Sequence, residues 1–146
     1  MYFVDTEHKE RFMEFLSGTE REQAITITDR NYVTACYLLT ASKTVWEKSK
    51  YFVTTNSRIY FCDIFATDLL TLPAFSKNEK NIVKLARELF SFGYSDNFSL
   101  ADMADDVDEK FFKCCISAIK YFRYGTLCSH AERKALKKAA SVGERE

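Results

Sequence analysis

The sequence contains one proline and four glycines in 146 residues, so it has few residues that interrupt helices. This scarcity excludes collagen-like and low-complexity chains, which are rich in both. Phosphate-binding loops of the P-loop or dinucleotide type need clustered glycines, whereas Gly18, Gly93, Gly125 and Gly143 lie far apart. The scarcity therefore favours ordinary helices and disfavours a nucleotide-binding loop.

An excess of one charge is also absent, because 21 basic side chains balance 21 acidic ones. A balanced chain gives no general reason to expect nucleic acid, which strongly basic domains bind. Apolar runs of roughly 20 residues, which cross a bilayer, are absent too, and the first residues lack the basic and apolar parts of a secretory signal. We therefore expect a cytoplasmic protein without a membrane partner.

Cysteine and histidine are spaced too widely to suggest a metal site. The five cysteines include no C-x-x-C pair, and the two histidines, His8 and His130, lie near opposite ends of the chain. Zinc sites usually combine paired cysteines with histidine, so we expect neither a metal nor another cofactor. Cysteines in apolar surroundings, such as Cys36 and Cys114, are typical of a reduced core.

A catalytic function also finds little support in the sequence. A nucleophile would need His8 or His130 as its base. His8 falls in the first turn of a helix that we expect to be exposed at its start, and His130 falls in a weakly anchored tail. Because catalytic groups need firm positions, the sequence predicts that the protein is not an enzyme.

Apolar residues, by contrast, are abundant. They make up 47% of the chain, which includes thirteen Phe, eight Tyr and one Trp. A chain of this length usually forms one domain. The sequence predicts a mainly α, single-domain fold of four to five helices with an aromatic-rich core over residues 1–125. Residues 126–146, with five basic and three acidic side chains, predict a basic, partly helical or flexible tail.

Two helices in the second half have capping signals. The pair Ser76 and Glu79 has the spacing of an N-terminal capping box, and so does the pair Asp106 and Glu109. A glycine follows each helix at the position of a C-terminal stop. The predicted helices cover residues 76–93 and 106–124. The central stripe of the second is predicted to consist of Phe112, Cys115, Ile119 and Phe122.

Three further helices are predicted in the first third of the chain. Asp5 or Thr6 can cap the first helix, which Gly18 would end, and Thr19 with Glu22 has the spacing of another capping box. The predicted ranges are 6–17, a buried helix over 29–41, and a short amphipathic helix over 43–50.

Two segments have less decisive patterns. Residues 51–55 and 58–62 are rich in strand-forming residues and predict a small β-hairpin near residues 51–62. Neither run alternates cleanly, so the pattern leaves strand pairing and its absence equally open. Residues 94–106 predict a linker with one helical turn that begins at Ser99.

A cluster of acidic residues, Asp102, Asp105, Asp106 and Asp108, precedes the last helix. Carboxylates favour a helix N-terminus, where they face the positive end of the helix dipole. The spacing does not match an EF-hand loop, which also needs a glycine. The cluster predicts an acidic surface that binds a basic partner, and the alternative is a metal-dependent enzyme that uses the acidic residues 102–109.

A basic and aromatic cluster, Lys120, Tyr121, Arg123 and Tyr124, lies near the end of the last helix. Tyrosine and arginine are frequent at the energetic centres of protein interfaces. Basic residues interleaved with aromatic ones also bind single-stranded nucleic acid. Because the net charge is zero, a protein partner is favoured, and a nucleic-acid-binding accessory protein is the alternative.

Four segments share their order and motifs with one protein family. Residues 3–12 are similar to a start of the form F-(L/N)-x-E-H-x-x-x-F, and residues 29–32 to an Asp-x-x-Tyr/Arg helix. Residues 80–90 are similar to K-x-x-x-L-A-x-x-L-F, and residues 107–121 to an acidic L-D-E-x-F…A-I-x-Y/R helix. In these respects the chain resembles small proteins, with a domain of unknown function, from phages and prophages of Gram-positive bacteria.

The resemblance covers about residues 3–124 and has one departure. The family carries a tryptophan shortly before its third motif, where this chain has Leu72-Pro73-Ala74-Phe75. The resemblance implies a phage or mobile-element origin and transfers no catalytic residue. The resulting hypothesis is a non-enzymatic protein that binds a host protein and inhibits a bacterial defence system such as a CRISPR effector nuclease. A homo-oligomer is compatible with the same sequence.

Overall fold

Six α-helices run through the part of the chain that the computed structural model describes, which comprises residues 2–22, 30–55, 75–90, 99–124 and 138. No strand occurs among these residues, so the prediction of a mainly α fold is confirmed. The helices are α1 (Thr6–Glu22), α2 (Arg30–Leu39), α3 (Lys43–Thr55), α5 (Lys77–Phe90), α6 (Leu100–Asp106) and α7 (Glu109–Tyr124).

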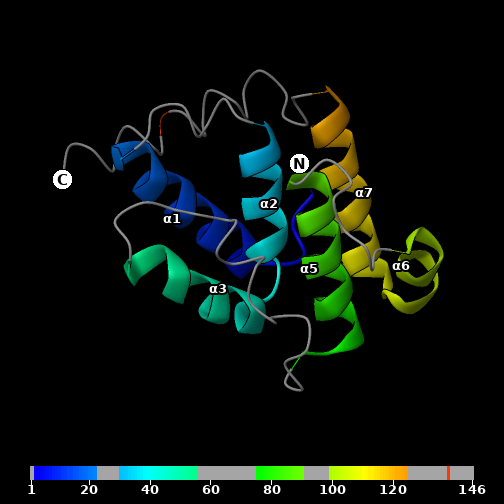
Figure 1. The fold of residues 1–146 in the computed structure, drawn as a ribbon. Coiled ribbons are helices and arrows are strands. Elements are labelled where there is room, and N and C mark those ends of the chain that lie inside the picture. Colours follow the sequence, from blue (N-terminus) through cyan, green and yellow to red (C-terminus); the bar gives the residue numbers. More distant parts are fainter. Residues whose placement is uncertain (1, 23–29, 56–74, 91–98, 125–137, 139–146) are drawn as a thin grey trace.

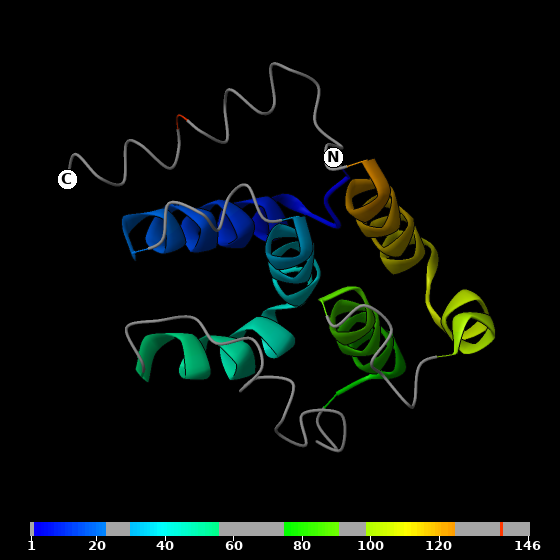
Figure 2. The ribbon, with the colours of Figure 1, turned by 45° about the horizontal axis from the view of Figure 1, so that its top comes forward.

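Helix α2 lies at the centre and runs opposite to α5 and α7 (Figure 1). Residues 33–39 of this helix are all buried. Just beyond one end of α2, the Ser42 hydroxyl donates to Glu79 Oε2 at 2.6 Å. At its other end, the guanidinium of Arg30 lies 5.1 Å from the centre of the Phe122 ring. Helices α1 and α3 extend on the side of α2 that faces away from α5 and α7 (Figure 2).

Side-chain caps fix where several helices begin. Asp5 caps α1, because its Oδ1 accepts a hydrogen bond from the His8 backbone N–H at 2.6 Å. Ser76 and Glu79 form the predicted capping box of α5, in which each backbone N–H donates to the side chain of the other residue. Ser99 caps α6 by accepting from the backbone N–H three residues later, which confirms the predicted turn at this residue.

The predicted cap of α7 at Asp106 is wrong. Val107 has an extended backbone (φ −85°, ψ 134°) that ends α6, and Asp108 caps α7 by accepting from the Phe111 N–H at 3.1 Å. Asp108 also forms a reciprocal pair with α5. Asn78 Nδ2 donates to Asp108 Oδ2 at 2.9 Å, and the Asp108 N–H donates to Asn78 Oδ1 at 2.8 Å. This pair brings the N-termini of α5 and α7 together.

Two further boundaries differ from the predictions. Helix α1 continues through Gly18 to Glu22, because a glycine inside a helix costs only about 1 kcal/mol and no proline follows it. The predicted stop at Gly18 and the predicted start at Thr19 are therefore both wrong. Helix α3 continues to Thr55, so residues 51–55 are helical and do not form the first strand of a hairpin. Each residue added to an existing helix gains a hydrogen bond, which outweighs a weak strand preference.

The buried face of α7 is turned relative to the predicted stripe. Cys114, Cys115 and Ala118 are fully buried, whereas Phe112, which was predicted to belong to the stripe, is 36% exposed. Phe111 packs against the core instead. Adjacent residues of a helix point about 100° apart, so a small rotation of the buried face exchanges Phe112 for Phe111.

Some predictions fall outside the described residues. These include residues 58–62 of the hairpin and the tail at 126–146, apart from Lys138, which is helical and exposed. Among the helices that the structure describes, none has the length and apolar character to span a bilayer.

Candidate functional site

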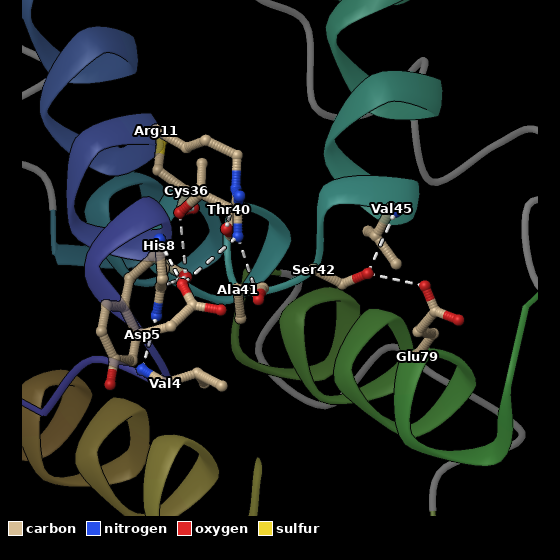
Figure 3. Close-up of polar contacts among 11 residues, drawn as sticks. Val4, Asp5, His8, Arg11, Cys36, Thr40, Ala41, Ser42, Val45 and Glu79 are labelled. Carbon is tan, nitrogen blue, oxygen red and sulfur yellow. Dashed lines mark hydrogen bonds and ion pairs between the residues drawn. The ribbon is translucent and has the colours of Figure 1, made fainter. Parts of the chain in front are cut away.

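His8 is buried, in contrast to the exposed position predicted for it. Its Nδ1 accepts a hydrogen bond from the Val4 N–H at 3.1 Å, and its Nε2 donates to the Tyr37 carbonyl oxygen at 2.8 Å (Figure 3). Both ring nitrogens are therefore engaged, and a substrate cannot reach either one. A sequence signal for this burial exists, because His8 lies four residues before the core residue Phe12 and so shares its helix face.

Aromatic rings surround His8 and determine its charge. The ring of Phe3 lies 5.1 Å from the imidazole and the ring of Tyr37 lies 5.0 Å from it, measured between centroids. Burial lowers the pKa of His8 from 6.5 to about 4, and the nearby Arg11 acts in the same direction. The hydrogen bond with Tyr37 and the charge of Asp5 oppose this shift. His8 is therefore a neutral core residue at physiological pH.

The N-terminal arm, residues 2–5, contacts both α2 and α7 next to the aromatic rings that surround His8. The Tyr37 hydroxyl donates to the Tyr2 carbonyl oxygen, and the Tyr2 N–H donates to Ser117 Oγ at 3.4 Å. Tyr2, Phe3 and Val4 also pack against the core. The arm and His8 thus form a structural junction.

The described cysteines are poor candidates for chemistry. Cys36, Cys114 and Cys115 are reduced, and each is fully buried, as predicted for core residues. Burial raises the pKa of the Cys114 thiol, and it raises the pKa of Cys115 to about 12. The thiols of Cys114 and Cys115 therefore remain protonated near pH 7. A thiol is a far weaker nucleophile or metal ligand than a thiolate.

The predicted acidic cluster is exposed but not convergent. Asp102, Asp105 and Asp106 lie on the surface of α6. Asp108 is exposed as well, but its carboxylate caps α7 and bonds to Asn78. In the described ranges, no group of three or more His, Cys, Asp or Glu residues has a geometry that could hold a metal ion.

The predicted basic and aromatic cluster lies at the opposite end of α7. Lys120, Arg123 and Tyr124 are exposed there, with Tyr124 at 66%. Tyr121 is half-buried and packs against the core, so it is only partly available to a partner. The structure therefore separates the two predicted clusters by the length of α7, which has 16 residues.

A groove that the sequence analysis missed lies between α1 and the start of α3. It has a volume of about 640 Å³. Its acidic lining residues are Asp5, Glu7, Glu10, Glu14 and Glu47. The basic lining residues are Arg11 and Lys43, so the formal charge of the lining is −3. We call this feature the acidic groove.

Arg11 is held in the lining of the acidic groove by backbone carbonyls and by one of the groove's own carboxylates. Its Nε donates to the Thr40 carbonyl at 2.8 Å and its Nη2 to the Ala41 carbonyl at 3.3 Å, just beyond the end of α2 (Figure 3). Its Nη2 also lies 3.9 Å from Asp5 Oδ1. Arginine commonly satisfies free carbonyls at a helix C-terminus in this way.

The acidic groove also has an apolar component. Trp46 and Phe111, both half-buried, contribute to its lining. Carboxylates beside partly exposed aromatic rings suit a Lys or Arg side chain, whose head is cationic and whose stem is apolar. One sequence signal points to the groove: Glu7, Glu10 and Glu14 recur at the spacing of one helix face.

No protein-family model, curated protein or solved structure matches this chain.

Proposed function

We propose that this chain is a non-enzymatic, cytoplasmic interaction protein that binds another protein in the acidic groove. The observation that carries the proposal is the groove itself, a hollow of about 640 Å³ with five carboxylates and two partly exposed aromatic rings. Among the described residues, the His8 imidazole and the thiols of Cys36, Cys114 and Cys115 are fully buried, so a substrate cannot reach them.

The charge of the acidic groove defines the chemistry of the partner. A surface segment with Lys or Arg would meet an opposite potential, which speeds association and discriminates against acidic proteins. Aromatic residues at the centre of the contact would supply much of the binding energy, because buried Trp side chains are frequent hot spots. Trp46 is one of the two aromatic residues that line the acidic groove.

The resemblance to phage proteins supplies the setting of this proposal. A phage or mobile-element protein that binds a host protein can inhibit a defence system, for example a CRISPR effector nuclease. A nuclease holds DNA phosphates with Lys and Arg, so it offers the basic surface that the acidic groove requires.

Capture from a Gram-positive lysate with the full chain as bait tests the proposal. We expect one stoichiometric partner that the double variant Glu10→Lys/Glu14→Lys no longer retains. The matched variant Asp102→Lys/Asp105→Lys reverses the same number of charges on α6 and should retain the partner. No stoichiometric protein, or loss with the α6 variant alone, would contradict the groove as the binding site.

A cleavage assay tests the finer part of the proposal. The purified partner, if it is a nuclease, should cut its DNA more slowly when the chain is present, and the Glu10→Lys/Glu14→Lys variant should not slow it. Unchanged cleavage with a bound wild-type chain would show that binding is not inhibitory.

A further inference from the structure

The end of α5, the end of α7 and the start of α2 lie on the same side of the molecule (Figure 1). Helices α5 and α7 begin close together, where Asn78 pairs with Asp108, and both run toward this side (Figure 1). Helix α2 begins here, as the contact of Arg30 with Phe122 shows. We call this side the basic end and define it by Arg30, Arg87, Lys120, Arg123 and Tyr124.

Among the described residues, cations outnumber carboxylates at the basic end. Arg87 is in the last turn of α5, Arg123 is in the last turn of α7, and the first turn of α2 has no acidic residue. Among the described side chains in these terminal turns, Glu88 is the one carboxylate. A neutral chain therefore contains a local excess of cations, which the sequence spreads over three distant segments.

Helix electrostatics explain only part of this arrangement. Basic residues at the ends of α5 and α7 face the negative ends of the helix dipoles, which is favourable without any ligand. Arg30 is at the start of α2, where the dipole disfavours a cation. Its position is instead fixed by the Phe122 ring, 5.1 Å from its guanidinium.

An aromatic ring lies beside each of two guanidinium groups of the basic end, and this arrangement suits planar ligands. The guanidinium of Arg123 lies 5.4 Å from the centre of the Tyr124 ring, and Tyr124 is 66% exposed. Arg30 is also exposed while it stacks on Phe122. Guanidinium planes and exposed rings both stack on unpaired bases, and cations hold the phosphates between them.

We propose that the basic end binds single-stranded nucleic acid, with Arg30, Lys120 and Arg123 on phosphates and Tyr124 stacked on a base. This activity goes beyond the proposed protein-binding function and uses a different surface from the acidic groove. An acidic protein would also be attracted by the charge, but it would not need the exposed Tyr124 ring beside the Arg123 guanidinium.

Fluorescence anisotropy with a labelled oligothymidylate and the full chain tests this site. We expect binding that weakens log-linearly with salt, and a Kd about tenfold higher or more in Lys120→Ala/Arg123→Ala, with a salt slope smaller by about 1.4 for two lost phosphate contacts. Tyr124→Ala should raise the Kd about tenfold and leave the salt slope unchanged, because it removes stacking alone.

The control Lys110→Ala/Lys113→Ala removes two cations from the other end of the same helix. It should change the Kd by less than about twofold at roughly 0.15 M salt, where the Debye length of about 8 Å is shorter than the rise of roughly 10 Å from Lys113 to Lys120. Circular dichroism confirms that each variant is folded. The host-partner capture described above should be unchanged in Lys120→Ala/Arg123→Ala, so the two proposals can fail separately.

Four outcomes would overturn the proposal. These are no binding at low salt, equal losses in both double variants, tighter binding of duplex than of single strands, or an unchanged Kd in Tyr124→Ala. Analytical ultracentrifugation tests the alternative that the basic end binds a second copy of the chain. Salt-sensitive self-association that Lys120→Ala/Arg123→Ala removes, without any oligothymidylate binding, would assign the basic end to a second copy of the chain.

Discussion

The imidazole of His8 lies between the N-terminal arm and α2, with a backbone group on each ring nitrogen. Protonation would place a hydrogen on Nδ1, opposite the Val4 N–H, so an accepted hydrogen bond would become a repulsion between two donors. The same proton would also put a charge inside a group of aromatic rings. The junction is therefore stable only while this single residue is neutral.

We expect the free energy of unfolding to fall as the pH is lowered below 6.5. The pKa of His8 is about 4 in the folded protein and 6.5 in the unfolded chain, so between these values only the unfolded chain takes up the proton. The contribution of neutral His8 to the free energy of unfolding is fully present above pH 6.5. It decreases as the pH is lowered to about 4, by roughly 3 kcal/mol in total. Urea denaturation at a series of pH values measures this slope.

The two histidines provide the control for this measurement. His8→Gln should lack the slope between about pH 6.5 and 5, where carboxylates are still mostly ionised. His130→Gln should keep the slope. A slope that survives in His8→Gln would show that another group causes it.

At the scale of helices, local signals predicted the starts better than the ends. The caps at Asp5, Ser76 and Ser99 involve partners three residues away, so the sequence alone can identify them. The start of α7 could not be identified in this way, because Asp106 and Asp108 both precede a helical pattern. Only the tertiary pair with Asn78 selects Asp108.

Glu79 joins two helices, so its loss should affect more than one cap. One carboxylate oxygen accepts from the Ser76 N–H at 2.9 Å and the other from the Ser42 hydroxyl at 2.6 Å. Burial would raise the pKa of Glu79, but these hydrogen bonds outweigh it and hold the pKa below its usual value. We expect Glu79→Ala to lower the free energy of unfolding by about 1 to 3 kcal/mol.

Denaturation of Glu79→Ala beside Lys80→Ala tests this prediction, since Lys80 is the next residue of α5 and takes part in no cap. Lys80→Ala should stay within about 0.5 kcal/mol of the wild type. Because the pKa of Glu79 is lowered by folding, its stabilisation is present above the unfolded pKa and lost as the pH falls through the folded value. Equal stability of both variants at pH 7 would argue against the double role.

The pair of Asn78 and Asp108 should show energetic coupling between α5 and α7. Asn78→Ala removes both hydrogen bonds, whereas Asp108→Ala removes only the one that its carboxylate accepts, because the backbone N–H of residue 108 remains. A double-mutant cycle of Asn78→Ala and Asp108→Ala should give a coupling energy of about 0.5 to 2 kcal/mol. Additive losses would mean that Asp108 acts only as the cap of α7.

At the scale of the whole molecule, the sequence predicted the class of fold but not the arrangement of its surfaces. The two predicted clusters are neighbours in sequence, and α7 places them at opposite ends. The acidic groove combines residues 5–14, 41–47 and 111, which no local pattern joins. The basic end likewise requires the antiparallel packing of α2 against α5 and α7.

Thiol labelling tests the packing of the whole core. Cys36, Cys114 and Cys115 are fully buried on α2 and α7, so we expect alkylation of these three only through global unfolding. Peptide mapping after iodoacetamide treatment should find them unmodified in native protein and fully modified in urea. Their common labelling rate should follow the unfolding equilibrium, and fast native labelling of any one would contradict this packing.

The bond between the Tyr2 N–H and Ser117 Oγ joins residues that are 115 positions apart. A ribosome that adds roughly 5 to 20 residues per second makes Ser117 about 6 to 23 s after Tyr2. The N-terminal arm is thus synthesised first, but it cannot dock until the last described helix has been made. During this interval Phe3 and Phe12 cannot be buried in a complete core. A chaperone at the ribosome exit can therefore bind these two side chains.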